Sequence, residues 1–334
     1  MPFSFWWNNA AAPTLLHSLG FSSGGYLRTT PAKKPTSLPE YQYRRLEVSD
    51  IETVTVFLRE NYGDTDWYLD AQSSWLLSYF QDPAVIVLGL FRNETLYGTI
   101  FSTPLSDGVT YIGSQTYDVR VIECLCIHAS LRKQGIAGFM ISAMDYETSA
   151  IRPIIHLWSR ELDALPLLST HLNAKNYCYL DCSAATERFP AARMDFPDFV
   201  SIWEHSYRRL GGIVTSLPSN RRGGLHVWRV NSSVFVVSDT KRRTRKGDLP
   251  IWEIVWCGKL GTDFTLSPYA ILPVEAESVA FHYFGIFFTM TEFSKLPWTS
   301  PWRVGHSGLQ AWYIYNFVPP SWGDCELHAI RDEI

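Results

Sequence analysis

The chain has 334 residues, of which 46% are hydrophobic, 15% are aromatic and 19% are charged. This composition excludes a disordered chain, and a chain of this length buries enough surface to fold without disulfides. With 29 basic and 33 acidic residues the net charge is −4, so no overall positive field attracts nucleic acid or an anionic membrane. No apolar run reaches the roughly 18 residues of a membrane-spanning helix, and a signal peptide is not expected.

None of the six cysteines belongs to a Cys-x-x-Cys pair. Cys124 and Cys126 alternate along a predicted strand, so they point to one face of it. We interpret the cysteines as free, buried thiols of a protein in a reducing compartment, the cytoplasm. We expect no metal site and no permanently bound cofactor.

The first forty residues contain most of the loop signals and predict an arm rather than a domain. Hydrophobic periodicity then predicts alternating helices and strands. Helices are expected at 50–61, 73–80, 134–148 and 162–173, and strands at 84–91, 95–101, 117–127, 153–158 and 177–180. This order combines antiparallel hairpins with a βαβ step, which is typical of an α/β fold with a mixed sheet.

The second half of the chain shows a similar but weaker pattern. A helix is expected at 199–210, and strands at 225–230, 234–237, 251–258, 279–288 and 312–317. We therefore expect an arm at 1–45, a first half at 46–190 and a second half at 191–334. The basic run 241–246 has two interpretations: a solvated hairpin tip, or a patch that makes weak contact with a ribosome or membrane surface.

The most informative segment runs from Ile122 to Ala137, through a predicted strand, a loop and the start of a helix. Arg132 and Gly135 place a forked donor and a flexible residue just before the helix. Backbone N–H groups and the helix dipole make such a place an anion site suited to a pyrophosphate. The pattern Arg-x-x-Gly-x-Ala after a strand is typical of acyl-CoA-dependent N-acyltransferases of the GNAT superfamily.

Four separated segments resemble, in the same order, the glycylpeptide N-tetradecanoyltransferases, or N-myristoyltransferases. They are FSFW at 3–6, ENY and SWLL at 60–62 and 74–77, IECLCIH at 122–128, and GLQAWYIYNF with PSWG at 308–323. The resemblance implies two tandem GNAT-like halves around a mixed, saddle-shaped sheet. It also implies that the first half, with the arm, binds myristoyl-CoA and that the second half binds most of the peptide.

The resemblance further implies direct attack of an N-terminal glycine amine on the thioester of myristoyl-CoA, which is a co-substrate. The backbone N–H groups of Cys124 and Leu125 would form the oxyanion hole. The implied acyl-CoA site consists of Phe5, Trp6, Tyr62, Cys126, Ile127, Arg132, Lys133, Gln134, Gly135, Ile136 and Ala137. The implied peptide site consists of Asp64, Asp66, His156, Asn173, Ser307, Gly308 and Tyr315.

In this family the chain's own terminal carboxylate accepts the proton of the attacking amine. The family's last residue falls near Asp332, so the carboxylate of Ile334 or the side chain of Asp332 or Glu333 would take this role. A solvated terminus is the remaining alternative. The signature's Asn is Glu123 here, and most other departures lie on the peptide side.

Three functions remain open. The first is N-myristoyl transfer by a monomer whose partners are proteins with an N-terminal glycine. The second is acyl-CoA-dependent acylation of another amine. The third is a catalytically silent module that holds acyl-CoA or acylated peptides.

Overall fold

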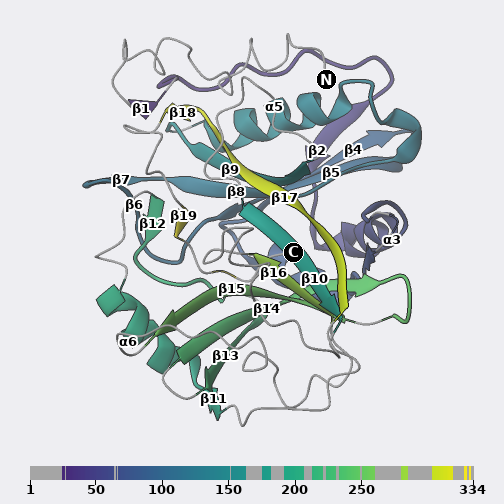
Figure 1. The fold of residues 1–334 in the computed structure, drawn as a ribbon. Coiled ribbons are helices and arrows are strands. Elements are labelled where there is room, and N and C mark those ends of the chain that lie inside the picture. Colours follow the sequence, from purple (N-terminus) through teal and green to yellow (C-terminus); the bar gives the residue numbers. More distant parts are fainter. Residues whose placement is uncertain are drawn as a thin grey trace.

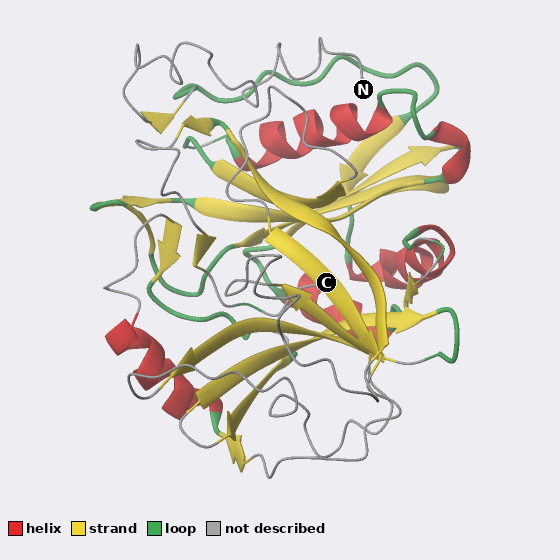
Figure 2. Ribbon diagram, in the orientation of Figure 1, coloured by secondary structure: helices red, strands yellow, loops and turns green. Residues whose placement is uncertain are grey.

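The computed structural model describes residues 25–26, 28–63, 65, 67–150, 152–162, 175–181, 192–206, 213–220, 223–230, 233–248, 250–259, 280–284, 303–318, 327–328 and 331. These residues form an α/β fold with helices on both faces of a large mixed sheet (Figures 1 and 2). The helices are α3 (Ile51–Asn61), α4 (Ser73–Gln81), α5 (Ile136–Thr148) and α6 (Phe196–Ser206), with short 3-10 turns η1 (Val48–Asp50) and η2 (Ala129–Leu131).

Most strands belong to one sheet of 13 strands, in the order β11-β13-β14-β15-β16-β10-β17-β9-β8-β5-β4-β2, with β3 beside β14. Two smaller sheets have the orders β19-β12-β6-β7 and β1-β18. The strands are β1 (Gly25–Tyr26), β2 (Gln42–Arg45), β3 (Trp67–Leu69), β4 (Ile86–Arg92), β5 (Thr95–Pro104), β6 (Thr110–Ile112), β7 (Gln115–Tyr117), β8 (Val119–Ile127), β9 (Ile155–Leu162), β10 (Lys175–Asp181), β11 (Ala192–Met194), β12 (Ile213–Thr215), β13 (Leu225–Val230), β14 (Ser233–Thr244), β15 (Pro250–Lys259), β16 (Ala280–Phe284), β17 (Arg303–Tyr315), β18 (Phe317–Val318) and β19 (Leu327–His328).

The large sheet continues across the two parts of the chain. β9 and β10 follow each other in sequence, but β17 lies between them and pairs antiparallel with both. Figure 1 shows β17 running diagonally from the upper strands to the lower ones. The long strand β17 joins the two parts of the sheet, so the sheet that contains β8 is continuous. The predicted boundary between the two halves of the chain at residue 190 stays a prediction.

The strands β4, β5 and β8 separate two apolar clusters on opposite faces of the sheet. Met140 of α5 packs with Ile100 on one face. Leu58 of α3 packs with Phe101 and Cys124 on the other face, which α4 also covers. Neighbouring residues of β5 therefore belong to different clusters, as the alternation of side chains along a strand requires.

The helices expected at 50–61, 73–80 and 134–148 are confirmed, and so is the βαβ step, because β8 and β9 run parallel and α5 joins them. The helix expected at 162–173 is wrong at its first residue, which ends β9, and its other residues lie outside the described part of the chain. β17 begins at Arg303, well before the expected residue 312. Its first residues include His306, Ser307 and Gln310, which weaken the apolar signal of a strand.

Candidate functional site

A β-bulge interrupts β8. Two of its residues, Cys124 and Leu125, stand opposite a single residue of β5, Ile100. Cys124 has a φ of 45°, in the left-handed region that residues other than glycine rarely adopt. The Thr99 hydroxyl donates a hydrogen bond of 3.0 Å to the carbonyl oxygen of Cys124. Bulges redirect backbone groups and occur often next to active sites, and this one lies at the predicted oxyanion hole.

Next to the bulge, β8 diverges from its parallel neighbour. β8 and β9 pair over three residues each, up to Val121 and Leu157. Beyond these residues β9 continues beside β17, while β8 continues beside β5. The bulge therefore lies where the described part of the chain places no strand on the β9 side of β8. An extended ligand can lie along such a strand edge.

The end of β8, η2 and the start of α5 line a pocket with a volume of about 310 Å³. The lining residues are Ile127, Leu131, Arg132, Lys133, Gly135, Ile136 and Ala137. Gly135 caps α5 with a φ of 83°, and an ideal Cβ built on it meets no atom within 4 Å. The backbone angle, and not crowding within the protein, therefore favours glycine here. The first N–H groups of α5 and the positive end of its dipole lie at this pocket.

Arg132 holds the pocket loop in place. Its Nε donates to the carbonyl oxygen of Ile127 at 3.0 Å, and its Nη2 donates to that of Asn61 at 2.8 Å. The guanidinium thus ties the loop to the ends of β8 and α3. Gln134 is exposed, and its Nε2 donates to the carbonyl oxygen of Ser130 at 2.9 Å. The predicted phosphate loop is therefore braced by its own side chains.

Two predicted acyl-CoA residues, Tyr62 and Cys126, pack on the other face of the sheet, against α3 and α4. Burial raises the pKa of the Tyr62 hydroxyl. Burial also raises the pKa of the Cys126 thiol to about 12, against a lowering effect of Arg132. A thiol with this pKa stays protonated near neutral pH, so Cys126 is a poor nucleophile.

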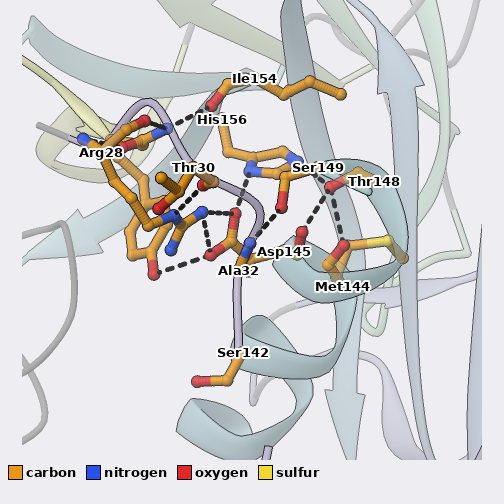
Figure 3. A network of polar contacts seen from close by, with 12 residues as sticks. Arg28, Thr30, Ala32, Ser142, Met144, Asp145, Thr148, Ser149, Ile154 and His156 are labelled. Atoms are coloured by element: carbon orange, nitrogen blue, oxygen red, sulfur yellow. Dashed lines mark hydrogen bonds and ion pairs between the residues drawn. The ribbon is translucent and has the colours of Figure 1, made fainter. Parts of the chain in front are cut away.

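His156 lies with Asp145 in a buried polar network (Figure 3). Tyr315 is buried and also contacts Asp145. The Tyr315 hydroxyl donates to Asp145 Oδ2 at 3.2 Å, and Arg28 Nη2 donates to Asp145 Oδ1 at 2.8 Å. His156 Nδ1 is 4.0 Å from Asp145 Oδ1, and His156 Nε2 is 3.1 Å from Thr148 Oγ1. The network gives His156 and Tyr315 a structural role, and their assignment to the peptide site stays a prediction.

The same network fastens the segment after β1 to the C-terminal end of α5. The backbone N–H of Ala32 donates to Ser149 Oγ at 3.0 Å, and that of Arg28 donates to Asn316 Oδ1 at 2.8 Å.

Burial lowers the pKa of His156 to about 3, and the nearby cations Arg120 and Arg28 act in the same direction. The imidazole is therefore neutral near pH 7.

A second buried ion pair lies directly before the bulge. Glu123 pairs with Nη2 of Arg331, and these side chains are 6% and 3% exposed. Thr103 Oγ1 donates to Glu123 Oε2 at 3.0 Å and accepts from Arg331 Nη2 at 2.9 Å. Sequence reasoning missed this contact. The available signal was a glutamate inside a strand that is mostly apolar, because a buried carboxylate requires a partner.

The basic run 241–246 occupies the end of β14 and the turn after it. This end of β14 pairs antiparallel with β3. The Arg242 guanidinium lies over the Trp67 ring at 4.6 Å, and Arg243 Nε donates to Asp248 Oδ1 at 2.8 Å. The run forms a hairpin end, as one interpretation expected, but several of its charges contact β3 and the hairpin itself.

Several predicted residues lie outside the described part of the chain, namely Phe5, Trp6, Asp64, Asp66, Asn173, Asp332 and Ile334. The backbones of Ser307 and Gly308 lie in β17, opposite Cys178 and Tyr177 of β10. Among the described residues, no group of three His, Cys, Asp or Glu side chains could hold a metal ion. No helix in the described ranges is both long and apolar enough to span a membrane.

Comparison with solved structures gives the same architecture. A structure of Saccharomyces cerevisiae N-myristoyltransferase with bound myristoyl-CoA has a TM-score of 0.69 at 13% identity, over 95% of this chain and 93% of that chain. Another structure of the yeast enzyme with myristoyl-CoA has a TM-score of 0.65 at 12% identity, over 98% and 89%. No protein-family model and no curated protein matches the sequence. The chain therefore has the fold of an N-myristoyltransferase, as the sequence resemblance predicts.

Proposed function

We propose that the protein is an acyl-CoA-dependent N-acyltransferase that moves a myristoyl group from myristoyl-CoA to the N-terminal glycine amine of a peptide. The observation that carries this proposal is the arrangement along β8. A bulge at Cys124 and Leu125 lies a few residues before a pocket built on a helix N-terminus. The fold likeness to a yeast enzyme crystallised with myristoyl-CoA supports the choice of donor.

In this proposal the pocket beside Gly135 binds the pyrophosphate of CoA. The N–H groups of the first turn of α5 donate to the phosphate oxygens, and Lys133 adds a positive charge at the pocket wall. The rest of the donor extends along β8, on the side from which β9 has diverged. This path brings the thioester to the bulge.

At the bulge the uncharged glycine amine attacks the thioester carbonyl carbon. A C–N bond forms, the C–S bond breaks, and CoA leaves as a thiolate that takes up a proton. The backbone N–H groups of Cys124 and Leu125 stabilise the negative charge that develops on the carbonyl oxygen. Direct attack fits the protonated state of the buried Cys126 thiol, because a protonated thiol is poorly suited to form a cysteine-bound acyl intermediate.

The amine must lose a proton before or during attack. His156 is buried against Asp145 and Thr148, and the His128 ring is engaged with Ser130 Oγ at 2.8 Å. The resemblance implies a terminal carboxylate as the proton acceptor, so we assign this role to the carboxylate of Ile334, with the side chain of Asp332 as the alternative. Adding a Gly-Ser tail after Ile334 is expected to abolish transfer and to leave acyl-CoA binding intact. If the extended protein kept full activity, Asp332→Asn would be the next test.

The deciding experiment incubates the protein with acyl-CoAs of graded chain length and a peptide that begins with glycine. Mass spectrometry is expected to find the peptide heavier by one acyl group, with the C14 donor preferred. A matched peptide with an acetylated N-terminus should remain unmodified. Acylation of another amine would favour a different N-acyltransferase. Tight acyl-CoA binding without any product would favour the silent binding module and contradict the proposal.

A further inference from the structure

The buried pair of Glu123 and Arg331 joins two parts of the chain that are far apart in sequence. Glu123 lies in β8 directly before the bulge, and Arg331 follows β19 near the C-terminal end of the sequence. The Arg331 backbone also forms an isolated parallel bridge with Ser219. Arg331 is thus held at two points, by its backbone and by its side chain, and the side-chain contact is the one that reaches the candidate site.

The chemistry of this pair is unusual for a purely stabilising contact. A buried ion pair costs much of its Coulomb attraction in lost hydration, and apolar residues of similar size often stabilise a protein as well. Two further donors of Arg331, Nε and Nη1, are buried and have no hydrogen-bond partner in the described part of the chain. Such unpaired donors make the arginine costly to bury. The contribution of the pair is therefore to fix the positions of Glu123 and Arg331 relative to each other.

The fixed pair lies next to the candidate catalytic centre, because Glu123 directly precedes Cys124 of the bulge. Thr103 of β5 bridges the two charges, so Arg331 contacts both strands that form the bulge. Removing the guanidinium would leave the Glu123 carboxylate buried beside Cys124 and would free the C-terminal segment from β8. Both effects would displace the groups that the reaction needs, and a displacement of about 1 Å can cost about 100-fold in rate.

We propose that Arg331 is a positioning residue, which fixes the C-terminal segment and the bulge in register through its contacts with Glu123 and Thr103. It touches no reacting atom and acts through the segment that follows it and through the bulge. This proposal rests on the proposed function, because it concerns where the proton acceptor lies during acyl transfer. It also explains how a glutamate is accommodated where the resembling family has asparagine.

The test compares Arg331→Gln with Arg120→Gln as a matched control. Arg120 is also a buried arginine of β8, and its Nε donates to Ser102 Oγ at 2.8 Å, whereas its Nη2 donates to the carbonyl oxygen of Ser102 at 2.8 Å. Carboxypeptidase should release residues 332–334 from Arg331→Gln at least about tenfold faster than from the unmodified protein, since release follows the population of the open segment. Arg120→Gln should release them at the unmodified rate, even where its melting temperature falls.

For transfer, kcat of Arg331→Gln should fall about 100-fold, while KM for the peptide and the Kd for myristoyl-CoA change less than about threefold. Arg331→Lys should recover part of the loss. If Arg331→Gln does not fold, Glu123→Gln replaces it, because this variant keeps the shape of the contact without its charge, and it should show the same direction with smaller changes. Unmodified release and kcat in a folded variant would overturn the proposal. If the unmodified protein transfers no acyl group, the proposed function fails, and the release rates still decide whether Arg331 anchors the segment.

Discussion

Replacing Gly135 by aspartate tests whether the pocket at the start of α5 binds phosphate. The φ of 83° at this position costs a typical residue about 1–2 kcal/mol, but Asn and Asp tolerate the left-handed region better than most. Because an ideal Cβ meets no atom within 4 Å, the new side chain projects into open space and the fold should survive. The effect should therefore appear in binding rather than in folding.

The size of the effect follows from Coulomb's law. A carboxylate about 4 Å from a phosphate charge is repelled by about 1 kcal/mol in water and about 4 kcal/mol near a protein surface, which is roughly 5- to 1000-fold in Kd. Gly135→Asn has nearly the same shape without the charge. The ratio of the two Kd values for myristoyl-CoA, measured by calorimetry, therefore isolates the electrostatic part. That ratio should shrink at high salt.

Gly113→Asp is the matched control for strain. Gly113 lies in the turn between β6 and β7, has a φ of 62°, and also has no atom within 4 Å of an ideal Cβ. It does not line the pocket, so its substitution should lower stability without changing the Kd for myristoyl-CoA. If Gly135→Asp and Gly135→Asn bound myristoyl-CoA as tightly as the unmodified protein, the pocket would not be the phosphate site.

The remaining predictions concern the bracing of the pocket loop by Arg132, the selectivity for peptides, and the pH dependence of stability. Arg132→Lys cannot donate to the carbonyl oxygens of both Ile127 and Asn61, so it should weaken myristoyl-CoA binding about tenfold, through about 1–2 kcal/mol of lost bracing. Replacing Asp64 and Asp66 by Asn should reduce turnover of glycine peptides with a downstream Lys more than that of neutral peptides, because the two carboxylates would attract the lysine side chain. Equal losses for both peptides would mean that Asp64 and Asp66 have a structural role. The folded-state pKa of His156, about 3, lies below its ordinary value of 6.5. Its contribution to stability is therefore complete above pH 6.5 and falls by about 1.4 kcal/mol per pH unit toward pH 3. Denaturant unfolding of His156→Gln should show a flatter pH dependence in that window, and an unchanged slope would contradict a neutral buried histidine.

The pocket could be predicted from the sequence because its determinants are local. An apolar run predicts β8, a glycine after a loop marks the start of a helix, and the period of the apolar residues predicts α5. All of these signals lie within residues 119–148, and the structure brings six of the predicted acyl-CoA residues to the pocket: Ile127, Arg132, Lys133, Gly135, Ile136 and Ala137. No pairing with a distant part of the chain is needed to form this loop.

The bulge could not be predicted from the residues themselves. Cys124 adopts a positive φ, yet neither glycine nor asparagine marks the position, and an uninterrupted strand would fit the same letters. The resemblance did single out Cys124 and Leu125, because their backbone N–H groups would form the oxyanion hole, but it did not predict a bulge there. The strand's irregular register with β5 depends on contacts with a strand about 25 residues away, such as the Thr99 hydroxyl on the Cys124 carbonyl oxygen.

His156 shows why a residue's role depends on its neighbours in space. From the sequence it is a histidine near the expected peptide groove, with structural and functional roles both open. In the structure Asp145 from α5 and Thr148 one turn later lie next to it, and the nearby charge of Arg28, from the segment after β1, lowers its pKa. None of these three residues could be linked to His156 by a pattern in the letters, because the contacts depend on how α5 packs on the sheet.

Glu123 is a second residue whose role depends on a partner that is distant in the sequence. A glutamate in the mostly apolar strand 119–127 is a departure from the resembling family, and from the sequence alone it counts against a working site. The structure places Arg331, 208 residues away, against it, so the buried charge of Glu123 is neutralised beside the bulge. A buried charge therefore implies a partner before the partner is known. The partner, Arg331, directly precedes the residues that we propose as proton acceptor. The glutamate that departs from the family therefore holds Arg331 beside the bulge, as the proposed positioning role of Arg331 requires.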